Sequence, residues 1–189
     1  MGLYLEDGGG SGKSAQINSE GRLLTSAVTA SLEHHANHQG HAYNVLFEQT
    51  PDGVDDCIFY MKNESETDAV VEGITLSATA LCHIRVERSN SGTASSPTTL
   101  TPVNLNGGSG LQADGTFQTG SSLGFDSSSV VELYRFSGDT TSKYFNFEQD
   151  IILPKNRSIT LWCVMPDSSG DVPTIYGTVI FHYHPLAEF

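Results

Sequence analysis

The sequence predicts an all-β fold, an antiparallel two-sheet β-sandwich of the jelly-roll kind with an extended N-terminal arm. Short runs rich in branched and aromatic residues recur along the chain, and Pro, Gly, Asn and Asp separate them. Antiparallel strands joined by tight turns require this pattern. No run shows a convincing amphipathic helical period.

The C-terminal part contains the clearest strands. Residues 150–166 hold two apolar runs that are broken by Pro154, Lys155 and Asn156, which predicts two strands and a turn. Residues 174–184 then alternate with the period of two that a strand requires. One set of side chains is Ile175, Gly177, Val179, Phe181 and Tyr183, and the other is Tyr176, Thr178, Ile180, His182 and His184.

Eight runs are predicted to be strands, and eight strands favour two packed sheets. In chain order they are residues 43–49, 57–62, 69–78, 80–87, 130–136, 144–153, 158–165 and 174–183. Within 81–88 the alternation separates a buried face from a face that we expect to meet water. The buried set is Cys82, Ile84 and Val86, and the solvated set is His83, Arg85 and Glu87.

The chain is predicted to have two parts, an arm over residues 1–41 and a sandwich over residues 42–189. The arm has a glycine-rich hinge at 8–12 and few apolar residues, so we expect it to be mobile or to order along a neighbouring surface. The sandwich contains a long Ser/Thr/Gly-rich excursion at about 89–129. Short strands near 98–105 and 116–119 are predicted inside it, with part of it projecting as a hairpin.

Composition excludes several classes of protein. Nine basic and 22 acidic residues give a net charge of −13, which repels phosphate backbones and argues against nucleic-acid binding. No apolar stretch is long enough to span a membrane, and the first residues lack a signal-peptide pattern. We therefore expect a chain made in a cytoplasm. Cys57, Cys82 and Cys163 each lie in a predicted strand, so they are expected to be reduced core thiols.

Several groups of residues resemble parts of binding sites without completing them. Residues 7–14 end as a phosphate-binding loop does, but Asp7 stands where that pattern needs Gly, so a linker is favoured. The histidines His34, His35, His38 and His41 have helical spacing for a metal site, yet few apolar residues surround them. His182 and His184 share one side of a strand, and we expect a polar strand face there. The acidic groups Asp52, Asp55 and Asp56, and Asp167 with Asp171, are expected to serve turns rather than Ca²⁺.

No hydrolytic motif is present. The chain contains no Gly-x-Ser-x-Gly elbow and no His-Glu-x-x-His helix, and counting carboxylates cannot exclude a glycosidase pair. Trp162 lies inside an apolar run and is expected in the core rather than as a sugar-stacking platform. We predict no catalytic residue, no cofactor, no cofactor-binding residue and no metal ligand.

Several segments resemble small virion structural proteins of tailed bacteriophages, particularly marine ones. Residues 7–23 follow the pattern Asp-Gly-x-Gly-x-Gly-x-x-Ala-x-(Ile/Val)-Asn-x-x-x-Arg-Leu. The resemblance continues through residues 28–31, 40–45, 59–63, 153–159 and 176–184 and thus spans most of the chain. It implies a β-sandwich particle component without enzymatic activity, and the family offers no catalytic or cofactor residues to carry over.

From this resemblance we expect a capsid decoration (cement) protein located in the virion and assembled in the bacterial host cytoplasm. Its expected partners are the major capsid protein or other virion proteins, with three copies forming a homotrimer and no nucleic-acid or membrane partner. The alternatives are a tail, neck or fibre component, or a host-glycan-binding module that uses the excursion as its recognition loop. A glycan hydrolase is a further alternative.

Overall fold

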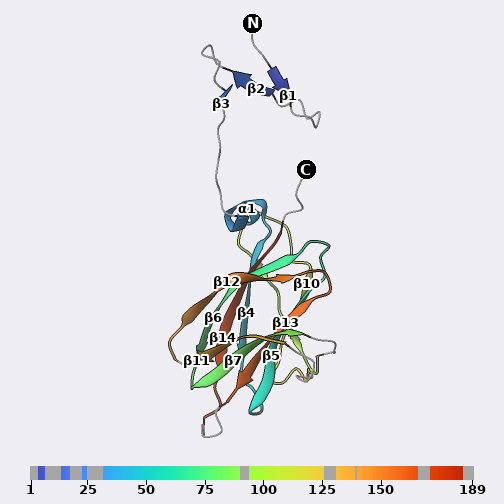
Figure 1. The fold of residues 1–189 in the computed structure, drawn as a ribbon. Helices are drawn as coiled ribbons and strands as arrows, with labels where there is room; N and C mark the ends of the chain where they lie inside the picture. Colours follow the sequence, from blue (N-terminus) through green and yellow to red (C-terminus); the bar gives the residue numbers. More distant parts are fainter. Residues whose placement is uncertain are drawn as a thin grey trace. The chain divides into compact units, whose positions relative to one another are not determined.

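A computed structural model describes residues 4–6, 14–17, 23–24, 32–89, 94–125, 131–138, 140–165 and 171–184 of the chain (Figure 1). The chain divides into two compact units, Met1–Ser31 and Leu32–Phe189. Residues 32–41 therefore belong to the larger unit and not to the N-terminal arm in which the sequence analysis placed them. In the described part of the chain, no helix has the length and apolar character needed to cross a membrane.

The small unit contains three short antiparallel strands. They are β1 (Tyr4–Glu6), β2 (Ser14–Ile17) and β3 (Leu23–Leu24), with β2 in the middle. Leu5 pairs with Ala15 on one side of the central strand, and Leu23 pairs with Ile17 on the other. Segments that were expected to be merely extended thus pair with one another.

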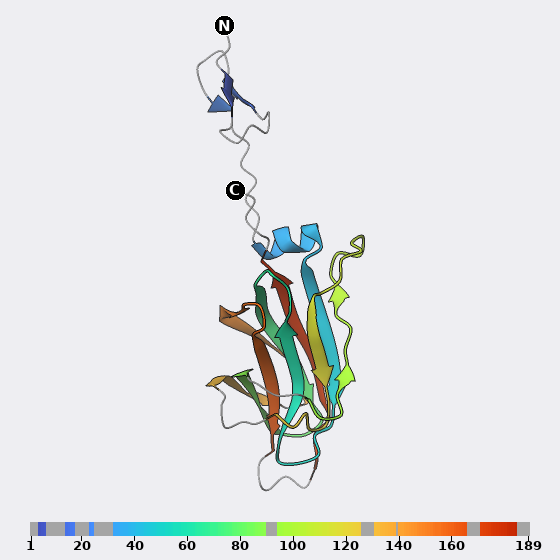
Figure 2. The same ribbon diagram turned by 90° about the vertical axis from the view of Figure 1, so that its right-hand side faces the viewer.

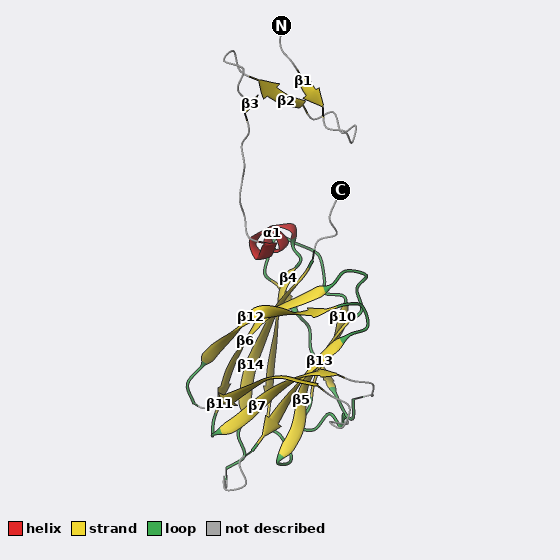
Figure 3. Ribbon diagram, in the orientation of Figure 1, coloured by secondary structure: helices red, strands yellow, loops and turns green. Residues whose placement is uncertain are grey.

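In the described part of the large unit, the regular structure is almost entirely strand, and the one helix there is α1 (Figure 3). All eight runs predicted to be strands form strands, with bounds that differ by at most a few residues. The helix and the long strands are α1 (Leu32–Gln39), β4 (Ala42–Gln49), β5 (Asp55–Asn63), β6 (Ala69–Ala78), β7 (Cys82–Ser89), β11 (Val131–Gly138), β12 (Lys143–Leu153), β13 (Ser158–Val164) and β14 (Ile175–Tyr183). Three shorter strands lie in the excursion: β8 (Thr98–Thr99), β9 (Val103–Asn104) and β10 (Gly115–Thr119).

These strands form two sheets in which every pairing is antiparallel. The six-stranded sheet has the order β11-β7-β13-β5-β10-β8, and the five-stranded sheet has the order β12-β6-β14-β4-β9. The all-β, antiparallel two-sheet sandwich is thereby confirmed, while the jelly roll stays a prediction.

The main core lies between the sheets and is rich in aromatic rings. Tyr43 stacks on Phe181 at 5.5 Å between ring centroids, and Phe117 also stacks on Phe181, at 5.3 Å. A Cβ at Gly177 would lie 2.2 Å from Cζ of Phe47, so only glycine lets the Phe47 ring pack across β14. Each large apolar side chain buried here contributes about 1.5–3 kcal/mol.

The two open sides of the sandwich are closed differently. On one side the edge strands β11 and β12 bring aromatic rings together, with Phe136 and Phe145 4.0 Å apart and Tyr134 and Phe147 4.7 Å apart. On the other side the excursion adds β10 and β8 beside β5, and β9 beside β4. Its described part is thus bound along both sheets rather than projecting as a hairpin. Covered edges are protected from pairing with other chains.

The helix α1 lies at one end of the sandwich (Figure 2) and contacts β4 and β14. Its Ala36 is fully buried. Gly40 ends the helix at φ +80°, with the Gly40 N–H donating to the Asn37 carbonyl and the His41 N–H donating to the Ala36 carbonyl. This is a Schellman cap. The sequence analysis predicted no helix because the segment LEHHANHQ has too few apolar residues to mark a buried face.

Candidate functional site

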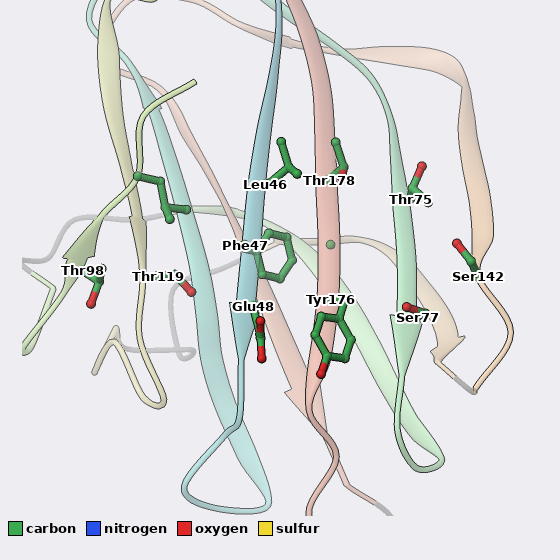
Figure 4. A pocket seen from close by; sticks show the side chains of 12 residues that line it. Leu46, Phe47, Glu48, Thr75, Ser77, Thr98, Thr119, Ser142, Tyr176 and Thr178 are labelled. Carbon is green, nitrogen blue, oxygen red and sulfur yellow. The ribbon is translucent and has the colours of Figure 1, made fainter. Parts of the chain in front are cut away.

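The candidate site is an open pocket of about 530 Å³ on the five-stranded sheet (Figure 4). Strands β4, β6 and β14, the excursion and the β11–β12 turn all contribute to it. Its lining residues are Leu46, Phe47, Glu48, Thr75, Ser77, Thr98, Leu100, Thr119, Ser142, Tyr176, Gly177 and Thr178. Six of these carry Ser or Thr hydroxyls, and we call the site the hydroxyl pocket.

Strand alternation places the central side chains of the hydroxyl pocket. On β14, Ile175 and Val179 are buried in the core, which turns Tyr176 and Thr178 outward. Antiparallel pairing then sets their neighbours in two rows across the sheet. The rows are Glu48, Tyr176 and Ser77, and Leu46, Thr178 and Thr75.

The excursion and the β11–β12 turn bound the hydroxyl pocket on opposite sides. Figure 4 shows Thr98 and Thr119 at one side and Ser142 at the other, with the residues of β4, β14 and β6 between them. Thr119 is held in place because its hydroxyl donates to the Ile58 carbonyl at 2.8 Å. The wall formed by the excursion is therefore fixed to the six-stranded sheet.

The hydroxyl pocket combines one exposed aromatic ring, an exposed leucine, hydroxyls and one carboxylate. Leu46 is 58% exposed and Tyr176 is 45% exposed, so both present apolar surface to solvent. Among the described residues that line the pocket, Glu48 is the only charged one, and no Lys, Arg or His is present. Such a surface can stack against a ligand and exchange hydrogen bonds with it, but it offers no cation to hold an anion.

The outward face of the six-stranded sheet has a different arrangement. A second buried group, which we call the outer cluster, packs there with Ala94 against it. Its members are Cys57, Tyr60, Leu123, Phe125 and Trp162. Tyr60 stacks on Phe125 at 4.7 Å. Trp162 is buried, as the sequence predicted, but beneath the excursion rather than between the sheets.

Charged side chains next to the outer cluster bond to one another. The Arg85 guanidinium lies over the Trp162 ring at 5.5 Å, donates to Asp55 at 2.8 Å and approaches Glu87 at 3.1 Å. Glu87 is only 3% exposed, so the prediction of a solvated Glu87 is wrong.

Burial raises the pKa of the Glu87 carboxyl, and Arg85 offsets part of this rise. Neighbouring outward residues on β11 pair too, with Arg135 donating to Glu132 at 2.7 Å.

The histidine cluster does not form a ligand set among the described residues. His34, His35 and His38 lie on α1, and His41 follows the helix. The side chains of His34 and His35 lie outside the described residues, while His38 is exposed and His41 is half-buried. Across the described ranges, no three His, Cys, Asp or Glu side chains come together as metal ligands would.

His182 and His184 have different surroundings. His182 does lie opposite Phe181, but it is 3% exposed and its Nδ1 is 2.6 Å from Oε1 of Glu72. The expected polar strand face is thus buried at this residue, where α1 contacts β14 and Glu72 supplies a polar partner. His184 is exposed.

The predicted acidic groups take part in turns and ion pairs. Asp52 accepts a hydrogen bond from the Ser121 hydroxyl at 2.7 Å, and Asp56 accepts one from the Gly53 N–H. Asp55 is the partner of Arg85. Asp171 is exposed, whereas Asp167 and residues 7–13 of the glycine-rich segment lie outside the described residues.

The three cysteines are free and buried, as predicted. Burial raises the pKa of the Cys57 thiol well above its ordinary value, and burial beside Cys82 does the same for Cys163. These two thiols are therefore protonated at neutral pH and poor nucleophiles.

The sequence analysis did not single out the residues of the hydroxyl pocket. The signal was present in the alternation of residues 174–184, which separates Tyr176 and Thr178 from the core set. Nothing in that pattern distinguishes a bare outward face from a covered one. Comparison with protein-family models, with curated proteins and with solved structures finds no match to this chain.

Proposed function

We propose that this chain is a structural protein of a tailed-phage virion, without enzymatic activity, that decorates the capsid and binds the major capsid protein or another virion protein. The observation that carries the proposal is the division into a small strand unit, Met1–Ser31, and a sandwich with its own core. Strands of two to four residues bury too little surface to be stable alone. The small unit is stabilised by docking on a neighbouring protein.

A decoration protein needs a rigid body whose sheet edges do not pair with strands of neighbouring copies. The excursion covers one side of the sandwich, and the aromatic rings of β11 and β12 pack on the other. Attachment through many weak contacts to a repetitive lattice then gives a large total stabilisation of the shell. A passive role is supported by the use of Cys57, Arg85 and Glu87 in packing and ion pairing.

The proposal includes a jelly-roll sandwich and a homotrimer. Consecutive long strands alternate between the sheets except for β7 and β11, which are neighbours in one sheet. Jelly rolls distribute eight strands over two sheets through such crossings. Sedimentation equilibrium tests the trimer, for which we expect three times the chain mass, and a monomeric mass at working concentration contradicts it.

Deleting residues 1–31 tests the attachment. We expect the truncated chain to keep the unfolding midpoint of the full chain but to lose binding to purified particles stripped of this protein. A matched control replaces Leu5 and Leu23 by Ser in the full-length chain and should weaken binding less than the deletion. Binding at normal occupancy without residues 1–31 would contradict the proposal and assign attachment to the sandwich.

The alternative, a tail, neck or fibre component, predicts a different location. Quantitative mass spectrometry of purified particles should give a copy number comparable to that of the major capsid protein if the chain decorates the head. A copy number of about a dozen or fewer, as in a single ring of tail or neck subunits, favours the alternative. Particles stripped of a cement protein should also burst at a lower temperature than decorated ones.

A further inference from the structure

Polar groups of the hydroxyl pocket are left without internal partners. Among the residues that the structure describes, the hydroxyls of Thr75, Ser77 and Thr178 form no hydrogen bond to another protein group, and neither does the Glu48 carboxylate. The outward face of the six-stranded sheet differs, because Arg85, Asp55 and Glu132 are all paired there. The hydroxyl pocket thus presents a set of donors and acceptors that only solvent or a ligand can use.

An exposed ring lies in the middle of these polar groups. Tyr176 pairs with Glu48 on one side and with Ser77 on the other, so its ring is flanked by a carboxylate and a hydroxyl. Leu46 lies one row further along β4. An aromatic face with hydrogen-bonding groups at its rim suits a ligand that has apolar C–H surfaces and many hydroxyls.

The charge of the hydroxyl pocket limits the kinds of ligand that it can bind. The described lining of the hydroxyl pocket contains one carboxylate and no basic residue, and the chain carries a net charge of −13. Phosphorylated, sulfated and sialylated ligands would be repelled. A metal ion would find a single carboxylate, which is too few oxygen anions for tight coordination. Neutral hydroxyl-rich ligands remain.

We propose that the hydroxyl pocket binds a neutral oligosaccharide. Tyr176 stacks on a sugar ring, Glu48 accepts hydrogen bonds from sugar hydroxyls, and Thr75, Ser77 and Thr178 exchange hydrogen bonds with neighbouring positions. The lining of the pocket runs from Thr98 of the excursion to Ser142 of the β11–β12 turn (Figure 4). This inference does not depend on attachment to a capsid, because the lining residues named above all belong to the unit Leu32–Phe189.

The experiment uses the full chain and a printed array of neutral, sialylated and sulfated glycans. We expect at least one neutral glycan to bind and the sialylated or sulfated forms of the same glycan to bind more weakly. The best neutral glycan is then titrated calorimetrically against variants. Tyr176→Ala should weaken binding by about tenfold or more, since losing a stacking ring removes roughly the free energy that separates affinities by that factor.

Two further variants separate binding from folding. Glu48→Gln removes the charge but keeps an acceptor, and should weaken binding less than Tyr176→Ala while leaving the unfolding midpoint unchanged. Val131→Ala is the control, because Val131 is an exposed apolar residue of β11 in the other sheet and does not line the hydroxyl pocket. The affinity of this variant should stay within about twofold of the wild type, since most surface substitutions have small effects.

Three results would overturn the inference. They are an array without any bound neutral glycan, stronger binding of the sialylated form than of the neutral one, and unchanged affinity in both Tyr176→Ala and Glu48→Gln. Deletion of residues 1–31 should leave glycan affinity unchanged. That outcome also distinguishes this site from the proposed capsid attachment, which the same deletion abolishes.

Discussion

The two outward faces of the sandwich show the same strand alternation but differ in burial. On the six-stranded sheet, Trp162 and Tyr60 are buried in the outer cluster, and Glu87 is buried beside Arg85. On the five-stranded sheet, Leu46 and Tyr176 are exposed in the hydroxyl pocket. An outward position in a strand therefore does not by itself define a solvated surface.

The excursion accounts for the difference. Leu123 and Phe125 of the excursion supply the apolar surface that covers Cys57 and Tyr60 of β5 and Trp162 of β13. On the five-stranded sheet the excursion adds only the edge strand β9. One long connection thus gives the sandwich a third layer on one face and leaves a ligand-accessible surface on the other.

The largest expected effect is that of Trp162→Ala. Trp162 is 5% exposed, contacts the outer cluster and carries the Arg85 guanidinium over its ring, so its removal should destabilise the fold by about 3–5 kcal/mol. Urea unfolding at equilibrium measures the change, with Trp162→Phe as a milder control. A loss below about 1 kcal/mol, the average for any substitution, would mean that the outer cluster is not a core.

Leu123→Ala should have the next largest effect. Leu123 is fully buried and belongs to the excursion, so we expect a loss of about 2–3 kcal/mol, the lower part of the range for Leu→Ala, because a loop can partly collapse into the gap. Limited digestion with subtilisin should then cut within residues 94–125 faster than in the wild type. Equal cutting rates would show that Leu123 does not hold the excursion on the sheet.

Glu87→Gln tests the buried charge of the covered face. Because the pKa of Glu87 is raised in the folded protein, the unfolded chain ionises first as pH increases, and the wild type loses stability between the ordinary carboxyl pKa and the raised value. The Gln variant lacks this loss, so it should be the more stable protein at neutral pH and lose that advantage in acid. Unfolding measured from about pH 4 to about pH 8 covers this window.

Glu132→Gln is the matched control for that experiment, with the opposite sign. The hydrogen bond from Arg135 lowers the pKa of Glu132, so the wild-type contribution is present above the ordinary carboxyl pKa and fades as pH falls through the lowered value. The Gln variant should therefore be slightly less stable at neutral pH. If both variants changed the free energy of unfolding in the same direction at neutral pH, the contrast between a buried and an exposed carboxylate on this face would be wrong.

Tyr176→Ala should have the smallest effect on stability. The ring is 45% exposed, so we expect a change within about 0.5 kcal/mol, as for most surface substitutions. Thermal unfolding compared with Trp162→Ala measures the contrast between the faces directly. A loss comparable to that of Trp162→Ala would show that the bare face is also a core.

The strands were predictable from the sequence because alternation and turn residues are local signals. Residues 69–78 were predicted with the bounds that β6 has, and residues 42–49 form β4 as expected to within one residue. Burial of Cys57, Cys82 and Cys163 followed from their places inside apolar runs. For the same reason, Tyr176 and Thr178 could be assigned to the non-core set of β14.

The tertiary structure alone decided which outward faces are covered. Glu87 and His182 are buried although both lie on outward positions of their strands. His182 meets Glu72, a residue distant in the sequence, and Glu87 lies beside Arg85. α1 contacts β4 and β14 and buries Ala36, and no apolar period in the sequence indicates this packing. Alternation in the sequence shows which side chains share a face of a strand. Whether an outward face is buried depends on contacts with segments distant in the chain, and such contacts do not bury the hydroxyl pocket.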